Sequence, residues 1–194
     1  MRRFKELATT LISIGYLLAT LPARAELPPD AVINGVYREI VHIHGYRAAP
    51  RIKVVRDGYP SRCGSVSFAG YCPSNHTVYI TDTGIKLAYN FGDAALAYIL
   101  AHEYAHAMQT AYGFTPRITP ISELQADCLA GFYLGKIPNI SFDRRDIQEI
   151  SALAYNVGDF SYWDKNHHGT PVQRLNAVTR GIQASVYSST AACF

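Results

Sequence analysis

The spacing of apolar residues, together with helix start and stop signals, predicts five helices, three of which carry one apolar face that packing can bury. The longest spans about 93–112, where good helix formers run up to a stop at Gly113. Others are expected at about 30–44, 122–129, 143–157 and 170–182. Asp30 is expected to cap the helix at 30–44, and Asp93 the helix at 93–112. Ser122 with Gln125 and Thr170 with Gln173 fit capping boxes for the 122–129 and 170–182 helices, although Thr119-Pro120 could start the 122–129 helix earlier.

Two short runs rich in β-branched and aromatic residues predict strands at 52–55 and 77–81. The segment 63–72 between them is expected to form a hairpin or loop, because it carries Gly64 and Gly70. Strands followed by a series of helices indicate an α+β domain. No linker or repeat divides 26–194, so we expect a single domain there.

The first 25 residues resemble a secretory signal peptide. A basic start leads into the apolar run Leu7–Leu21, and Ala23-Arg24-Ala25 fits the rule for signal cleavage. A retained membrane anchor is the alternative, but a spanning helix needs about 20 apolar residues and this run is shorter. We therefore expect cleavage after Ala25, no stable membrane insertion afterwards, and a periplasmic or secreted protein.

The charge pattern excludes one class of partner. The chain has 18 Lys and Arg against 15 Asp and Glu, but the surplus lies in the first 25 residues, which hold four basic side chains and one acidic side chain. Basic and acidic side chains balance in 26–194. A nucleic-acid binder needs a basic surplus to displace counterions from phosphates, so we expect no nucleic-acid partner.

Four cysteines, all beyond the predicted signal, agree with export to an oxidising compartment. Three pairings are open to Cys63, Cys72, Cys128 and Cys193. Cys63 and Cys72 flank a glycine-containing turn region and form the natural local pair, which leaves Cys128 for Cys193. Four free thiols are the alternative, and no CxxC spacing indicates a cysteine zinc site.

The candidate chemistry begins in the longest predicted helix, at His102-Glu103-Tyr104-Ala105-His106. Residues four apart on a helix share a face, so both imidazoles can reach one zinc ion. Glu103 is offset from them by about 100° around the helix, beside the metal, where it can accept a proton from water. This HExxH arrangement is typical of zinc hydrolases.

A catalytic zinc site needs a third protein ligand. Glu123, 17 positions after His106 across a proline-containing turn, is the best candidate. Asp127, one helical turn later, is expected to hydrogen-bond the far nitrogen of a ligand histidine. The alternatives are a first-turn acid for Glu123, which the helix dipole favours, and a surface position for Asp127.

The reaction also needs a donor for the developing oxyanion. We expect His168 to supply it, since it lies just before the capped helix at 170, with His167 as the less favoured neighbour. Asp159 is a candidate for orienting His168. Arg174 is expected to tie its helix to the domain through an ion pair.

These strings resemble the bacterial neutral zinc metallopeptidase family, from about 62 to 194. The similar residues are Cys63-Gly64-Ser65, Tyr71-Cys72-Pro73, Val78-Tyr79-Ile80, the HExxH string, Glu123-Leu124-Gln125-Ala126-Asp127-Cys128-Leu129-Ala130-Gly131, His168-Gly169-Thr170, Gln173-Arg174 and Cys193. The segment 160–166 departs from the family pattern. The resemblance implies one zinc held by His102, His106 and Glu123, with Glu103 as the base. It also implies a zincin-like fold with HExxH on a central helix, in which a strand such as 77–81 borders the cleft and pairs with extended substrate.

We therefore predict an exported zinc endopeptidase that acts on a peptide or protein substrate. One alternative is a zinc-dependent amidase that cleaves cell-wall peptide cross-links with the same site. The other is a non-catalytic binding protein that keeps zinc for stability. The last is disfavoured because a closed structural site needs a fourth protein ligand, and none is evident near Glu123.

Overall fold

Helices dominate the computed structural model, which describes residues 25–45, 47–164 and 167–194. The predicted signal therefore lies outside the described residues except for Ala25. The helices are α1 (Pro29–His44), α2 (Asp82–Tyr89), α3 (Asp93–Ala111), α4 (Thr119–Lys136), α5 (Arg144–Asn156) and α6 (Pro171–Val186). The strands are β1 (Arg51–Val55), β2 (Tyr59–Ser61), β3 (Gly64–Val66), β4 (Ala69–Cys72) and β5 (Thr77–Thr81). The α+β class is confirmed.

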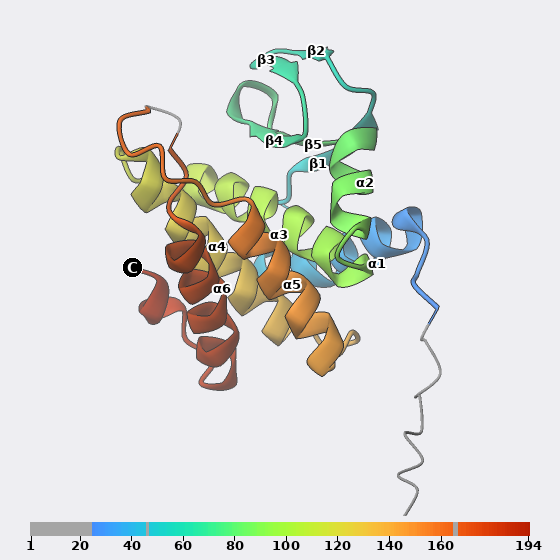
Figure 1. Ribbon diagram of the computed structural model, residues 1–194, viewed down its shortest axis with the longest axis vertical. Coiled ribbons are helices and arrows are strands. Elements are labelled where there is room, and N and C mark those ends of the chain that lie inside the picture. Colours follow the sequence, from blue (N-terminus) through green and yellow to red (C-terminus); the bar gives the residue numbers. More distant parts are fainter. Residues whose placement is uncertain (1–24, 46, 165–166) are drawn as a thin grey trace, which may run out of the picture.

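A small mixed sheet covers one side of the helices (Figure 1). Its order is β1-β5-β4, with β1 parallel and β4 antiparallel to β5. The separate hairpin of β2 and β3 lies over the sheet. Every residue of β5 is buried because the strand has a neighbour on each side and helices beneath it. β4 therefore forms one edge of this sheet.

Helix α3 runs through the centre of the helical part (Figure 1). Of its 19 residues 16 are buried, which matches a sequence that is apolar around the whole helix rather than along one stripe. It packs against α1, α4, α5 and the sheet. A helix held on all sides fixes the directions of the few polar side chains that it carries, and these include the HExxH residues.

Both disulfides follow the favoured pairing, Cys63 with Cys72 and Cys128 with Cys193. The second ties the C-terminal turn Thr190–Cys193 to α4. Close packing joins α4 to α6, since a Cβ on Gly181 would lie 1.9 Å from the carbonyl oxygen of Cys128. No helix in the described ranges combines the length and apolar character needed to cross a membrane.

Several expected helix ends were wrong. Pro28 precedes α1, so Asp30 lies inside its first turn. Gly92 caps α3 at φ 134°, a conformation open to glycine, and the carboxylate of Asp93 instead accepts the backbone N–H of Leu27. Helix α4 begins at Thr119, which confirms the earlier of its two expected starts and removes the Ser122–Gln125 box.

Other features of the helices depend on tertiary contacts. The Thr170–Gln173 capping box is present as predicted. Helix α2 was not predicted because its eight residues carry no long apolar period, and it is stabilised by contacts with α3 and β5. These differences leave the central helix and its motif where the sequence placed them.

Candidate active site

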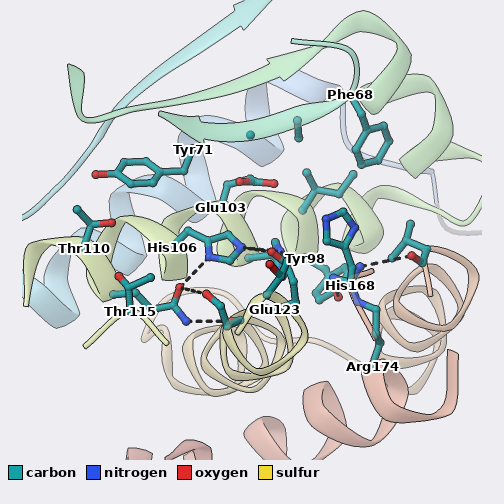
Figure 2. A pocket seen from close by; sticks show the side chains of 18 of the residues that line it. Phe68, Tyr71, Tyr98, Glu103, His106, Thr110, Thr115, Glu123, His168 and Arg174 are labelled. Carbon is teal, nitrogen blue, oxygen red and sulfur yellow. Dashed lines mark hydrogen bonds and ion pairs between the residues drawn. The ribbon is translucent and has the colours of Figure 1, made fainter. Parts of the chain in front are cut away.

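The HExxH residues line a cleft of about 730 Å³ between β4, α3 and α4 (Figure 2). The turn after α3 folds α4 back against it, and Glu123 on α4 meets the imidazoles of His102 and His106. His102 is buried, and His106 and Glu123 are partly exposed toward the cleft. Residues from two helices therefore converge at the cleft floor.

The donor atoms of these three residues lie at the spacing of zinc ligands. Nε2 of His102 and Nε2 of His106 are 3.1 Å apart. The Glu123 carboxylate oxygens lie 3.2 Å from Nε2 of His102 and 3.3 Å from Nε2 of His106. Ligand atoms about 2.0–2.1 Å from a tetrahedral zinc ion lie about 3.3 Å from one another. The three residues therefore fit one zinc ion.

Hydrogen bonds on the far side of each ring fix which nitrogen faces the cleft. Nδ1 of His102 lies 2.8 Å from a carboxylate oxygen of Asp127, and Nδ1 of His106 lies 2.7 Å from Oε1 of Gln109. Both partners are acceptors, so each Nδ1 carries a proton, and Nε2 of each ring is the atom that can offer a lone pair to a metal ion beside Glu123. Three acceptors then face one another, and a cation is what such a group can bind.

Without a cation, the close approach of these side chains shifts the pKa values of His102 and Glu123. Burial lowers the pKa of His102, but the carboxylates of Asp127 and Glu123 outweigh burial and raise it to about 10. Burial raises the pKa of Glu123, but the two imidazoles outweigh it and hold that pKa far below its ordinary range. The site therefore retains positive charge between its acceptors, which is the role a metal ion fills.

Asp127 is the centre of a fully buried network beneath the metal donors. Its carboxylate accepts hydrogen bonds from the hydroxyl of Tyr98 at 2.5 Å and from Nε and Nη2 of Arg174, each at 2.8 Å. Burial raises its pKa, but Arg174 and then His102 outweigh burial and lower it to about 2. The predicted ion pair of Arg174 is present, and its partner is Asp127.

Gln109 was missed by the sequence reasoning. Its amide nitrogen donates to the carbonyl oxygen of Ser122 at 3.0 Å and to Oε1 of Gln125 at 2.9 Å, which turns its own oxygen toward His106. Gln109 lies one turn after His106 on α3, so helical spacing could have indicated it. It links the second imidazole to α4 in the way that Asp127 holds the first.

Gln109→Leu is expected to weaken zinc affinity by about 10–100-fold, because His106 loses the acceptor that sets its tautomer. Competition with a chelator measures this directly. The matched control is Gln148→Leu, an exposed position on α5 outside the cleft, which should leave the affinity unchanged. Equal zinc affinities for the two variants would contradict this role of Gln109.

Glu103 lies beside the three donor residues and not among them (Figure 2). It is 9% exposed and lines the cleft. The hydrogen bonds of the two imidazoles join them to Asp127, to Gln109 and to each other, and not to Glu103. A carboxylate in that position is available to a molecule in the cleft.

His168 also lines the cleft, and its side chain is exposed. Asp159, the candidate for orienting His168, contacts the backbone of that residue. The Asp159 carboxylate lies 2.7 Å from Nδ1 of the buried His167. It also accepts the backbone N–H groups of Ser161, at 2.6 Å, and of His168, at 3.3 Å. The hydrogen bond with His167 is the main cause that lowers the pKa of Asp159 to about 2. Asp159 therefore shapes the loop that carries His168.

The strand at the cleft edge differs from the one expected. β5 lies between β1 and β4, so it cannot pair with a further strand. β4 lines the cleft instead through Ala69, Gly70 and Tyr71. The sequence could not distinguish the two strands, since β4 is short and rich in small residues.

A family model described as "Putative neutral zinc metallopeptidase" matches residues 34–193. The chain belongs to this metallopeptidase family. Membership implies zinc and supports a general peptidase activity, and both agree with the donor geometry. The match also covers α1 from residue 34 onward, which extends the resemblance seen from residue 62 toward the N-terminus.

Bacterial relatives of this protein were also found. "Uncharacterized protein YpfJ" of Escherichia coli K12 is 27% identical over 168 residues, covering 70% of this chain and 58% of that protein. "Uncharacterized protein Rv2575" of Mycobacterium tuberculosis is 30% identical over 189 residues, covering 78% of this chain and 64% of that protein. The chain thus spans about three fifths of these relatives. No solved structure gives a significant match.

Proposed function

We propose that this protein is an exported zinc endopeptidase with a zincin-like fold. One observation carries the proposal, namely that Nε2 of His102, Nε2 of His106 and the Glu123 carboxylate converge with spacings of 3.1–3.3 Å. Because both Nδ1 atoms are engaged elsewhere, the converging atoms are acceptors that a divalent cation can join. The predicted signal at 1–25 and the two disulfides support export.

Glu103 acts as general base and then as general acid. When bound, zinc supplies Lewis-acid chemistry that acidifies water and polarises a peptide carbonyl. Glu103, at the side of the metal donors, takes a proton from the attacking water and returns it to the leaving amine. His168, exposed in the same cleft, donates a hydrogen bond to the oxyanion that forms at the scissile carbonyl.

The edge of β4 holds the substrate chain. The N–H of Thr81 donates to the carbonyl of Phe68, so Phe68 and Thr81 form a hydrogen-bonded pair. In an antiparallel ladder, hydrogen-bonded residue pairs alternate with pairs that are not hydrogen-bonded. The pairs Ala69–Ile80 and Tyr71–Val78 fall at the positions without hydrogen bonds. The N–H and C=O groups of Ala69 and Tyr71 therefore point away from β5. An extended peptide can pair with them.

The alternatives use the same three ligands. A zinc ion kept only for stability needs a fourth protein ligand, and among the described residues no other His, Cys, Asp or Glu joins this cluster. A cell-wall amidase remains the second candidate in reaction class, since its chemistry at the metal is the same and only the substrate differs.

Incubation with casein and, separately, with purified cell-wall material distinguishes the two reactions. We expect cleavage of casein that stops when a chelator removes zinc and returns when zinc is restored. Release of cross-link peptides from wall material without any casein cleavage would favour the amidase. Casein cleavage that persists after complete removal of metal would refute both.

A further inference from the structure

A second pocket lies on the outer face of the sheet, away from the cleft. Arg51 and Lys53 alternate along β1 and so share one face, and the register places Lys53 beside Tyr79 of β5. The β2–β3 hairpin covers part of this face (Figure 1), with the ring of Tyr59 5.5 Å from that of Tyr79. A pocket of about 380 Å³ remains open between hairpin and sheet.

The lining of this pocket is strongly cationic. Arg51, Lys53 and Arg62 all line it, and none of the described Asp or Glu residues does. The tyrosine hydroxyl of Tyr79 already accepts a hydrogen bond from the amide of Asn75 at 2.9 Å, which leaves its own proton for another acceptor. Basic and acidic side chains balance over 26–194, so the positive charge here is a local feature.

Two of these three basic residues lie on segments that other contacts hold in place. Nη2 of Arg51 donates to the carbonyl oxygen of Asn75 at 2.7 Å. Arg62 precedes Cys63, whose disulfide with Cys72 fastens the hairpin to β4. Like charges held near one another repel, and a bound anion removes that repulsion. Two guanidinium groups with a lysine suit a compact group of about two negative charges, which is a phosphate.

We propose that this pocket binds a phosphate group, carried by a free phosphate compound or by the headgroup of an anionic phospholipid. It is separate from the zinc cleft, so the proposal stands independently of the peptidase activity. Occupancy by a lipid headgroup would hold the enzyme at a membrane surface, whereas occupancy by a soluble phosphate would not.

The test measures binding of inorganic phosphate by calorimetry and binding to phosphatidylglycerol vesicles by sedimentation, with phosphatidylcholine vesicles for comparison. The variant Lys53→Gln/Arg62→Gln should weaken whichever binding occurs by at least about tenfold. Arg144→Gln/Arg180→Gln removes the same charge from exposed positions on α5 and α6 and is the matched control. Unchanged melting temperatures show that both variants fold.

Binding to phosphate alone identifies a soluble ligand, and binding to phosphatidylglycerol vesicles alone identifies a lipid headgroup. Either result supports the proposal if only the pocket variant loses it. The proposal is overturned if neither probe binds, if both double variants lose binding equally, or if acetate binds as tightly as phosphate.

Discussion

Replacing Glu103 by glutamine is expected to lower kcat for peptide cleavage by about 10²–10⁴-fold while zinc remains bound. Glutamine has the shape of glutamate but cannot take a proton from water. The carboxylate of Glu103 belongs to neither the metal donors nor the hydrogen-bond network around them, so its neutralisation leaves the ligands in place. Steady-state kinetics on a peptide and zinc content of the same preparation measure the two effects.

The matched control for this variant is Glu39→Gln. Glu39 is also buried, but it lies on α1 and bonds Asn139, outside the cleft. It should retain the wild-type kcat. If Glu103→Gln with full zinc cleaves as fast as the wild type, another group is the base and the mechanism proposed here is wrong.

The second large effect is expected at Asp127. Asp127→Asn removes the negative charge that faces Arg174, whose side chain is 6% exposed. A buried guanidinium without its partner destabilises the fold by about 3–5 kcal/mol. His102 also loses the carboxylate that holds its Nδ1 proton, so zinc affinity should fall by about 10–100-fold.

Measuring urea unfolding with and without chelator separates these two consequences. The loss from the unpaired arginine is present in the metal-free protein, whereas the zinc part appears only when metal is supplied. The double variant Asp127→Asn/Arg174→Gln should lose less stability than the sum of the two single variants, because neither charge is then left alone. Strict additivity would mean that the pair does not interact as the structure indicates.

The convergence of the three proposed metal donors could be predicted because their geometry is largely local. The imidazoles of His102 and His106 share one helical face by spacing alone, and Asp127 follows Glu123 by one turn. Only the position of Glu123 needed a tertiary assumption, that the turn after α3 folds α4 back. The close approach of α3 and α4 places Glu123 against both imidazoles.

The features that sequence reasoning missed all depend on packing between distant segments. Whether β4 or β5 forms the edge at the cleft is decided by strand order, which no residue pattern within either strand encodes. Asp159 meets His167 rather than the ring of His168 because the loop folds His167 inward. Adjacent histidines give no sign in the sequence of which one is buried.

The central claim is that His102, His106 and Glu123 hold one zinc ion. Zinc X-ray absorption on the purified protein tests it most directly. We expect one zinc per chain, with two imidazoles and oxygen ligands at about 2.0–2.2 Å. A protein without zinc, or a spectrum with sulfur at about 2.3 Å, would contradict the account.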